Sequence, residues 1–586
     1  RDRAIIRERI RLAMGMSLRP ENREHPGHLT QGLEESNIDE KYYEPPLMQV
    51  IPSACNACPE NRYEVTSSCM GCLAHPCQSV CPKGAISMKN GKSVIDQEKC
   101  IKCGKCREIC PYDAICHKER PCKAACGIGA ITSDHVGRAV IDNEKCVSCG
   151  QCMVSCPFGA IADKSQIFQL IRAMQSGRKI IAQVAPAFAG QFGPKVTPEM
   201  FKTALKELGF ADVYETALGA DMGCMAEAEH YVKEVATGKQ QFALTSCCPS
   251  WSVMAKNLFP ETIDKISNEL TPMVATARLI KQEHPDASVV FIGPCASKKL
   301  EASRRTVRSD VDFVITFEEL TGMFEAKGIL LDEIKAMDEM KDATAAGRGY
   351  GVAGGVANAI KDCIEKYYPG TPVNIQHAES LAECKKALLL AKAGKMNGCL
   401  IEGMACPGGC IAGAGTNIAI PVAARAVDKF KNEAEKKVPD ESVDQELVEL
   451  EKETGVTLAN SPTVNVGYEA VDELPKERHE SPMLSLGKTK SREELRDWLQ
   501  GNPAILSWKL DGLTIVLTYR EGKLAKAVTR GNGEIGEVIT NNARTFKNLP
   551  LNISYTGELI LRGEAVITYS DFEKINGEIA DAEAKY

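Results

Sequence analysis

Short apolar runs alternate with amphipathic stretches from about residue 165 onward, and this pattern predicts an α/β domain. Four of the runs are strand-like, and each leads into a loop. They lie in KIIAQVAPAF, QFALTSCC, ASVVFIGPCASKK and NGCLIEGMACPGGC. Because ligands of open parallel sheets bind beyond the carboxyl ends of the strands, we expect reactive side chains in these loops to lie close together.

Three of the loops carry cysteine. The first holds Cys247 and Cys248, the second Cys295, and the third Cys406 and Cys410. The two glycines between Cys406 and Cys410 let the backbone approach a bulky inorganic body closely. The loops therefore predict a metal-cluster site, and the alternative is that they hold buried structural cysteines. We expect that structural role for Cys224, Cys363, Cys384 and Cys399.

The 586-residue chain has 26 cysteines, most of them between positions 55 and 156. They form CxxC ladders in a chain whose start has no apolar signal-peptide core. This favours metal ligation in a reducing cytoplasm over a secreted disulfide scaffold. The formal net charge is -7, so the chain as a whole lacks the positive charge that would attract nucleic acid. No apolar run approaches the ~18–20 residues of a membrane span, so we expect no membrane partner.

Two cysteine runs have the C-x2-C-x2-C-x3-C-P spacing of bacterial ferredoxins, and they begin in the near-copies VIDQEKC and VIDNEKC. In such a run three thiolates hold one [4Fe–4S] cluster and the fourth holds its neighbour. A zinc site would need isolated CxxC pairs instead. The runs are Cys100, Cys103, Cys106, Cys110 and Cys146, Cys149, Cys152, Cys156.

Each full run follows a modified half-run, and pairing the halves predicts three regular clusters. His75 lies inside the first half-run. We expect it to lie at the surface or behind the ligands rather than to be a ligand itself. The regular sets are Cys69, Cys72, Cys77 with Cys110; Cys100, Cys103, Cys106 with Cys81; and Cys146, Cys149, Cys152 with Cys126.

A fourth set is irregular, because Glu119 stands where a second cysteine would fall. A fourth cubane, a three-iron cluster and an empty site all remain open, so we expect three to four additional clusters. A row of clusters would pass single electrons between a surface partner and a buried site. The members of the irregular set are Cys116, Cys122 and Cys156, with Cys55 and Cys58 as candidates for the missing ligand.

The predicted fold class is multidomain, with α/β and α+β parts. An N-terminal extension with a CxxC pair precedes two ferredoxin-like cluster domains. The α/β domain, a charged linker and a further domain follow. Their boundaries are 1–62, 63–115, 116–164, 165–435, 436–478 and 479–586.

TSCCPSW, PCASKK and EGMACPGGCIAGAG resemble, in order and spacing, the three signature motifs of [FeFe]-hydrogenases. With the ferredoxin-like array the resemblance covers about residues 50–430. It implies the reaction 2H+ + 2e− ⇌ H2, with ferredoxin or a similar electron carrier and dedicated maturation proteins as partners. It also implies an H-cluster, a [4Fe–4S] cubane joined by one thiolate to a two-iron unit with CO, cyanide and azadithiolate. The cubane ligands by resemblance are Cys248, Cys295, Cys406 and the bridging Cys410.

The resemblance also gives roles to residues that are not ligands. Cys247 would pass protons to and from the azadithiolate amine, and Lys298 would donate to a cyanide of the two-iron unit. Met404 and Pro186 would line the pocket of that unit.

The outward proton relay of the family falls on Glu227 and Ser267, each 20 residues from Cys247. His230 stands where a second relay glutamate is usual, and a histidine can titrate near neutral pH. Gly293 stands where the best-studied members carry methionine. These departures, with the unusual cysteine array, suggest the divergent clade often called group B.

An alternative function is hydrogen sensing, in which the same H-cluster would serve an appended output domain with little turnover. Retention of Cys247, Lys298 and Glu227 favours turnover. We do not expect a DNA-repair enzyme with accessory clusters, because we recognise no NMN-binding or DNA-binding module of a ligase in the given sequence.

The segment at about 480–586 resembles the adenylation domain of NAD-dependent DNA ligases through KLDG, TRGNG and RGE. Ser507 and Asn532 depart from the family's glutamate and aspartate. We therefore expect AMP or NAD binding, or a structural or regulatory appendage, rather than ligation. By resemblance the nucleophile is Lys509, and the residues around the nucleotide are Asp511, Arg530 and Glu564.

Overall fold

The computed structural model describes residues 1–19, 28–303, 309–440, 476–478, 513–529, 535–544, 546 and 549–566. The chain forms two compact units, Arg1–Gln445 and Glu446–Tyr586, and each is described by itself. The expected mixture of α/β and α+β parts is confirmed. Within the described ranges no helix is both long enough and apolar enough to cross a bilayer.

The first unit contains a four-stranded parallel sheet with the order β10-β9-β12-β13. Every residue of β9 and β12 is buried, which explains why both strands form continuous apolar runs in the sequence. The strands are β9 (Ile180–Val184), β10 (Asp212–Glu215), β12 (Ser288–Gly293) and β13 (Phe313–Thr316).

A second parallel sheet has three strands in the order β11-β15-β14. They are β11 (Phe242–Leu244), β14 (Asn374–Glu379) and β15 (Cys399–Met404). The four strand-like runs of the sequence are therefore all strands, but they are divided between two sheets. Apolar periodicity indicates that a segment is a strand, but it does not show which strand it pairs with.

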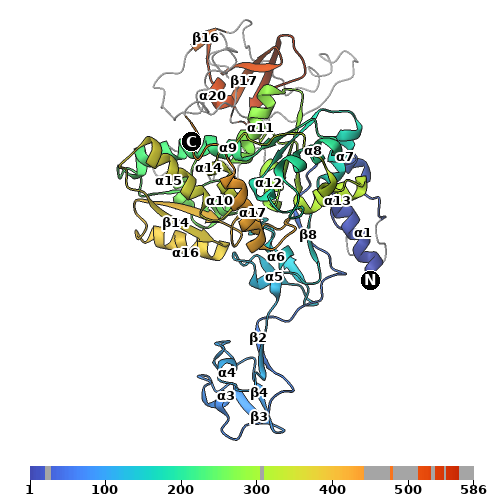
Figure 1. The fold of residues 1–586 in the computed structure, drawn as a ribbon, viewed down its shortest axis with the longest axis vertical. Helices are drawn as coiled ribbons and strands as arrows, with labels where there is room; N and C mark the ends of the chain where they lie inside the picture. The colour runs from blue at the N-terminus through green and yellow to red at the C-terminus, as the bar shows by residue number, and fades with distance from the viewer. Residues whose placement is uncertain are drawn as a thin grey trace, which may run out of the picture. The chain divides into compact units, whose positions relative to one another are not determined.

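Helix α9 (Ala217–His230) lies between the helices of the two sheets (Figure 1). On one side it packs against α11 (Pro272–Glu283), which contacts β9 and β12. On the other side it packs against α15 (Gly355–Tyr367). Both α15 and α16 (Leu381–Lys392) contact β14 and β15. A helix that touches both layers is well placed to carry residues of a site formed between the two sheets.

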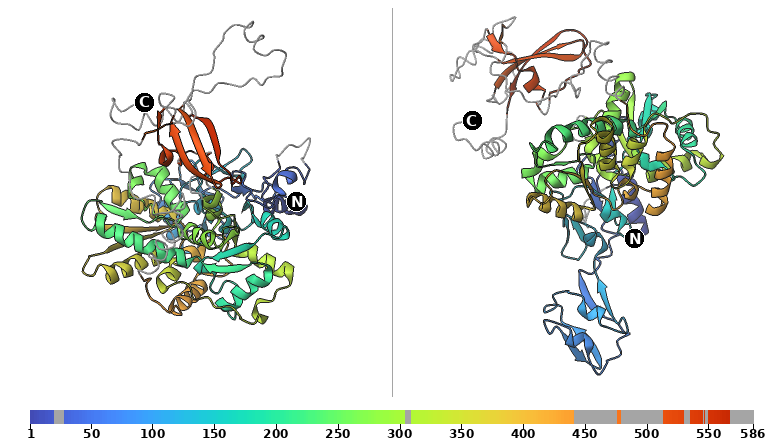
Figure 2. Two further views of the ribbon diagram at one scale, coloured as in Figure 1. Left: turned by 90° about the horizontal axis from the view of Figure 1, so that it is seen from above. Right: turned by 60° about the vertical axis from the view of Figure 1, so that its left-hand side comes forward.

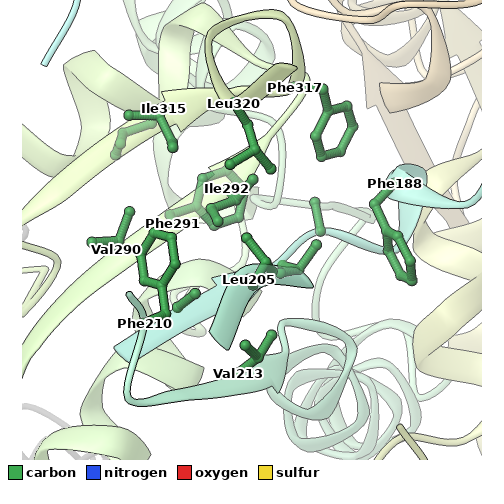
Figure 3. Packing of buried hydrophobic residues seen from close by; sticks show 14 of the residues in the cluster. Phe188, Leu205, Phe210, Val213, Val290, Phe291, Ile292, Ile315, Phe317 and Leu320 are labelled. Carbon is green, nitrogen blue, oxygen red and sulfur yellow. The ribbon is translucent and has the colours of Figure 1, made fainter. Parts of the chain in front are cut away.

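The largest apolar core surrounds the four-stranded sheet (Figure 3). Phe291 and Ile292 of β12 and Ile315 of β13 are almost fully buried there. Leu205 and Phe317, on the flanking helices α8 (Pro198–Leu208) and α13 (Phe317–Lys327), belong to the same core. Full burial of a side chain of this size stabilises the fold by about 1.5–3 kcal/mol, so this core fixes the strands whose ends carry the cysteine loops.

The internal repeat of the sequence is also a structural repeat. Each ferredoxin-like segment combines a short antiparallel hairpin with two one-turn helices that pack together. Asn90 and Gly91, with φ of 50° and 75°, form the two-residue turn of the first hairpin. The elements are β3 (Ile86–Lys89), β4 (Lys92–Ile95), α3 (Pro76–Ser79) and α4 (Lys105–Glu108), then β6 (Ile131–Ser133), β7 (Ala139–Ile141), α5 (Pro121–Ala124) and α6 (Gln151–Val154).

Two further antiparallel pairs join chain segments that flank these hairpins. β2 (Arg62–Val65) pairs with β5 (Ile115–Lys118), and β1 (Met48–Val50) pairs with β8 (Ile161–Asp163). The second pair brings the N-terminal CxxC segment beside the end of the second ferredoxin-like segment.

The second unit contains a three-stranded antiparallel sheet in the order β18-β17-β20, drawn in red in Figure 2. Glu521 and Gly522 both have positive φ and make the two-residue turn between the first two strands. Tyr519 and Leu524 are part of a separate apolar core. The elements are β16 (Lys476–Arg478) paired with β19 (Ile535–Glu537), then β17 (Leu513–Arg520), β18 (Lys523–Thr529), β20 (Leu559–Ala565) and α20 (Thr540–Ala543).

Candidate functional site

The loops that follow β9, β11, β12 and β15 line one cavity of about 820 Å3, where cavity volumes here and below count all atom-free space, including space open to solvent. All five cysteines of the three cysteine loops contribute to its lining. Strand ends from both sheets therefore meet at one place, although the two sheets share no hydrogen-bonded strand. The thiols are Cys247, Cys248, Cys295, Cys406 and Cys410.

The adjacent thiols of Cys247 and Cys248 have different neighbours. Cys248 is the residue directly before α10 (Pro249–Leu258), which begins at a proline. Cys248 interacts most strongly with Cys295 among the charged groups around it. For Cys247 the strongest charged influences are instead the carboxylates of Glu402 and Glu227, and burial raises the pKa of both thiols.

Lys298 lies in the same cavity and is held in a defined position. Its Nζ donates to Glu301 Oε2 over 2.6 Å and to the Cys247 carbonyl over 3.3 Å. Glu301 is oriented in turn by the hydroxyl of Thr271 at 2.9 Å. Burial acts against the ammonium, but Glu301 more than offsets this, so the pKa of Lys298 lies above its ordinary value. The cavity therefore contains a charged donor beside the thiols.

Pro186 and Met404 also line this cavity. Among the other lining residues to which we assigned no role from the sequence, two bear directly on the site. Phe291 is one, and Tyr350 is the other; burial raises the pKa of the Tyr350 hydroxyl well above its usual value. Only the glycine cluster GRGYG around Tyr350 hints at a close approach of backbone.

Phe291 explains how Gly293 is accommodated. A side-chain carbon on Gly293 would lie 2.5 Å from Cε1 of Phe291 and 3.2 Å from Cβ of Ala185. The ring of Phe291 thus fills the space that a side chain at position 293 would occupy. The departure of Gly293 from the family pattern is matched by an aromatic side chain two residues earlier.

Glu227 is the central carboxylate of the expected proton relay. Its Oε2 is buried without a hydrogen-bond partner among the described residues, and the Ser267 side chain favours the ionised form of the same carboxyl group. Burial raises the pKa of Glu227 to about 7. His230, one turn further along α9, is exposed. Helix α9 thus carries a carboxyl group that can gain or lose a proton near neutrality and, at its solvent end, an imidazole.

The second ferredoxin-like segment reaches the central cavity directly. Cys149 is part of the cavity lining, and its thiol interacts with that of Cys248. The amide of Gln151 donates to Cys406 Sγ over 3.3 Å. Gly150 packs so closely that a side-chain carbon there would lie 2.5 Å from Cβ of Ala414. The place of Gln151 inside a cysteine run is the only sequence signal for this role.

The regular accessory sets are also brought together. Cys126, Cys146, Cys149 and Cys152 interact with one another electrostatically, and Cys106 does so with Cys100 and Cys103. Cys81 packs in the same small core as Cys100 and Cys106. The last set surrounds a cavity of about 380 Å3 lined by Cys69, Cys72, Cys77 and Cys110.

His75 lies in the lining of that 380 Å3 cavity. Its φ is 44°, and its buried Nδ1 has no hydrogen-bond partner among the described residues. The imidazole ring of His75 therefore lines the same cavity as the four cysteines of this set.

The irregular set is divided by the structure. Cys55, Cys58, Cys122 and Cys156 line a cavity of about 330 Å3. Cys116 is not part of that lining; it lies in β5, where its thiol contacts the Glu64 carbonyl at 3.5 Å.

Three of the four remaining cysteines are buried as expected, whereas Cys399 is partly exposed. Cys224 and Cys363 face each other with their Sγ atoms 3.1 Å apart. Cys384 belongs to a different apolar core from Cys224 and Cys363. Its thiol contacts the backbone carbonyls of Ala378 and Met404.

The donor sets fit iron–sulfur clusters. Within the described ranges, no three His, Cys, Asp or Glu side chains surround a single metal ion. The thiols instead line cavities in groups of four or more, and four thiolates around one space suit a cubane.

Residues 178–414 match the family model of the iron-only hydrogenase large subunit, C-terminal domain. The resemblance to hydrogenases is confirmed for this hydrogenase-like domain. Residues 68–115 match a 4Fe-4S dicluster domain and residues 139–162 a 4Fe-4S binding domain, so the expected iron–sulfur binding segments are confirmed as well. A variant of the [FeFe]-hydrogenase HydA1 from Chlamydomonas reinhardtii has 23% identity and a TM-score of 0.40; the match covers 46% of this chain and 89% of that chain.

Residues 471–586 match the NAD-dependent DNA ligase adenylation domain, which confirms the second resemblance. A DNA ligase of Lachnoclostridium phytofermentans is 71% identical over 141 residues, 24% of this chain and 22% of the ligase. One of Ruminiclostridium cellulolyticum is 62% identical over 164 residues, 28% of this chain and 25% of the ligase. The chain thus spans a quarter or less of the length of these relatives. The family match begins inside the segment that we expected to be a linker.

The expected nucleotide-binding residues fall mostly on parts of the chain without described structure. Glu564 lies in β20 and is exposed. Lys509, Asp511 and Arg530 lie outside the described residues.

Proposed function

We propose that the hydrogenase-like domain catalyses 2H+ + 2e− ⇌ H2 at an H-cluster. The observation that carries the proposal is one cavity lined by the four cysteines that match the family's cubane ligands, by Cys247 and by the charged donor Lys298. The ligands would be Cys248, Cys295, Cys406 and Cys410. When bound, the H-cluster supplies the electrons and the metal site at which protons are reduced.

The side chains around the cavity position and shield the cofactor. Lys298, fixed by Glu301, would hold a cyanide of the two-iron unit through its ammonium. Met404, Pro186 and Phe291 give the cavity apolar walls that exclude water. An ammonium in a dry cavity interacts with an anionic ligand more strongly than it would in water.

Protons would move between the cavity and solvent through the chain's own side chains. Cys247 would donate or accept at the cavity, and Glu227 would exchange the proton with it. A carboxyl group with a pKa of about 7 holds and releases a proton with similar ease at neutral pH. Ser267 and the exposed His230 would complete the path to solvent.

Electrons would enter through the ferredoxin-like segments. They would pass into the central cavity from the last accessory cluster, whose prospective ligand Cys149 lies in the cavity wall. The segment 62–118 has nine Lys and Arg against five Asp and Glu, whereas the whole chain has a net charge of -7. Met70 and Leu73, beside Cys69 and Cys72, are 68% and 95% exposed. This basic surface with exposed apolar residues suits an acidic one-electron carrier such as a ferredoxin.

Infrared spectroscopy of protein matured with the two-iron unit tests the H-cluster. We expect bands of CO and cyanide together with hydrogen evolution from a reduced carrier. Full iron loading without those bands would overturn the proposal.

The docking surface has its own test. Lys102→Glu combined with Lys105→Glu should raise the KM for an acidic ferredoxin several-fold at low salt and leave the rate with a small dye unchanged. The exposed Lys327, in α13, provides a matched control as Lys327→Glu. Equal effects of both substitutions would count against this surface.

Hydrogen sensing is a second candidate function. The ligase-like unit favours it, because a unit with an apolar core of its own suits the appended output domain of a sensor. A sensor would show the same infrared bands with little turnover. The rate per H-cluster therefore separates the two candidates.

A further inference from the structure

We propose that Cys55, Cys58, Cys122 and Cys156 hold a fourth accessory [4Fe–4S] cluster. The four thiols line a cavity of about 330 Å3, close in size to the 380 Å3 cavity of the regular set that includes Cys69. Only Cys156 lies inside a segment that matches a cluster-binding family. The other three ligands come from outside both matches.

The thiols come from three separate stretches of chain. Cys55 and Cys58 follow β1, Cys122 lies in α5, and Cys156 follows α6. Cys58 interacts with Cys55 and Cys156, and Cys122 interacts with all three of the others. Four mutually close thiols are the donor set of a cubane.

The Cys55–Cys58 loop has the backbone conformation of the regular cluster loops. Ala57, the residue before the second cysteine, has a φ of 46°. A left-handed conformation is uncommon for a residue other than glycine and costs roughly 1–2 kcal/mol. The loop therefore has a local conformation that a plain surface turn would not require. The corresponding residues of the three regular CxxC loops are Gly71, Lys102 and Ser148, with φ of 61°, 60° and 53°.

Backbone N–H groups point at the sulfurs of this set as they do elsewhere in the array. The N–H of Ala139 donates to Cys55 Sγ and that of Ala160 to Cys156 Sγ, both over 3.4 Å. Such bonds stabilise a thiolate and are typical of cluster ligands. The same contact occurs in two regular sets, from Ala85 to Cys81 at 3.3 Å and from Ala130 to Cys126 at 3.2 Å.

Arg120 fixes the N-terminal loop against the second ferredoxin-like segment. Its buried guanidinium donates twice to the Cys58 carbonyl, at 2.9 and 3.3 Å. It also donates to the carbonyls of Thr132 and Gly137 and to the hydroxyl of Ser133. This clamp places the CxxC pair where an ordinary ferredoxin run would supply its first two ligands.

The residues at those ordinary positions have other surroundings. Cys116 lies in the β2–β5 ladder with its thiol at the Glu64 carbonyl, and Glu119 is exposed. The CxxC pair thus replaces Cys116 and Glu119, and it makes the irregular set complete.

The position of the site defines what the cluster would do. Cys122 and Cys152 are close enough to interact, and their helices α5 and α6 pack together. The cluster would therefore neighbour the one that reaches the central cavity through Cys149, as a one-electron carrier in the same row.

Iron and sulfide analysis of the anaerobically reconstituted full chain tests the site. Cys55→Ala combined with Cys58→Ala should lose about four iron atoms per chain, because one cubane is missing. Cys116→Ala is the matched control and should lose none. Retention of all iron in the double variant, or loss of about four in Cys116→Ala, would overturn the proposal.

A milder variant covers the case in which the double variant does not fold. Cys58→Ser alone should leave three cysteine ligands, and the oxidised protein should then show a new three-iron signal in electron paramagnetic resonance. Cys116→Ser should not. An unchanged spectrum of Cys58→Ser, or a three-iron signal already present in the native chain, would contradict a four-cysteine cubane. Neither readout needs hydrogen turnover, so failure here is distinct from failure of the H-cluster proposal.

Discussion

The side-chain amide of Gln151 donates a hydrogen bond to Cys406 Sγ over 3.3 Å. Gln151 stands between Cys149 and Cys152, so the bond joins a cluster loop of the second ferredoxin-like segment to a prospective ligand of the central cubane. Hydrogen bonds to cluster sulfurs stabilise the more negative, reduced state.

Removal of this bond should lower the reduction potential of the central cubane. We expect Gln151→Leu to shift it by some tens of millivolts, since a hydrogen bond contributes about 1 kcal/mol and a tenfold change in a one-electron equilibrium is about 59 mV. A redox titration followed by electron paramagnetic resonance measures the shift. Gln175→Leu, at an exposed position of α7 (Ile167–Gln175), should leave the potential unchanged. An upward shift in Gln151→Leu would contradict the assigned effect.

The two adjacent cysteines should respond differently to the same substitution. Cys247→Ala should keep the full iron content and lose nearly all turnover, because Cys247 is expected to transfer protons rather than to bind iron, and its strongest charged influences are carboxylates. Cys248→Ala should lose iron from the central site, because its thiol faces Cys295. Iron analysis and hydrogen evolution distinguish the two outcomes. Native activity in Cys247→Ala would rule out its part in proton transfer.

Glu227 should link turnover and stability to pH. We expect Glu227→Gln to lower turnover by about 10²–10⁴-fold, the usual contribution of a positioned acid or base. The pKa of Glu227 is raised from 4.5 to about 7, so the folded chain binds more protons than the unfolded chain between those values. Its contribution to stability therefore falls as pH rises through that window.

Glu227→Gln should remove that dependence on pH. Above pH 7 the variant should be more stable than the native chain by up to ~3 kcal/mol, and near pH 4 the difference should vanish. Urea unfolding at several pH values measures the difference. A constant difference across the range would mean that Glu227 does not titrate there.

Lys299 should be a structural residue although it is adjacent to Lys298. Its ammonium is buried and lies 2.8 Å from both Asp163 of β8 and Glu319 of α13. Lys299→Met would leave the two carboxylates without their counter-ion and should cost about 3–5 kcal/mol in unfolding free energy. Lys327→Met at an exposed position should change stability little. A loss of similar size in both variants would argue against the buried ion pair.

Gly293 and Phe291 should show coupled energies. Gly293→Met places a side chain against the Phe291 ring and should destabilise the domain by about 1–3 kcal/mol. Phe291→Ala opens space and should also destabilise it. The double variant should recover part of the loss, which a double-mutant cycle on thermal unfolding measures. Strict additivity would show that the ring does not occupy the place of a side chain at position 293.

Much of the site follows from the sequence because its residues lie directly after strands. The runs before Cys247, Cys295 and Cys406 are buried strands, and a loop beyond a strand end is confined to the edge of its sheet. Spacing alone also indicates the regular cluster sets, because a ferredoxin run is a local motif.

What the sequence did not reveal depends on contacts between distant segments. The division of the strands into two sheets is set by pairing, which apolar periodicity does not encode. Gln151 reaches Cys406 across 255 positions, and Ala139 reaches Cys55 across 84. The replacement of Cys116 by the Cys55–Cys58 pair likewise needs the β1–β8 pairing and the Arg120 clamp.

The central cavity lies where two separate sheets meet. Cys295 comes from the sheet of β12, whereas Cys248, Cys406 and Cys410 come from the sheet of β11 and β15. A cubane bound by all four would cross-link two halves of the domain that share no strand ladder. Cluster binding would then be part of the folding free energy. Insertion of the inorganic core would set the melting temperature of the hydrogenase-like domain as well as its chemistry.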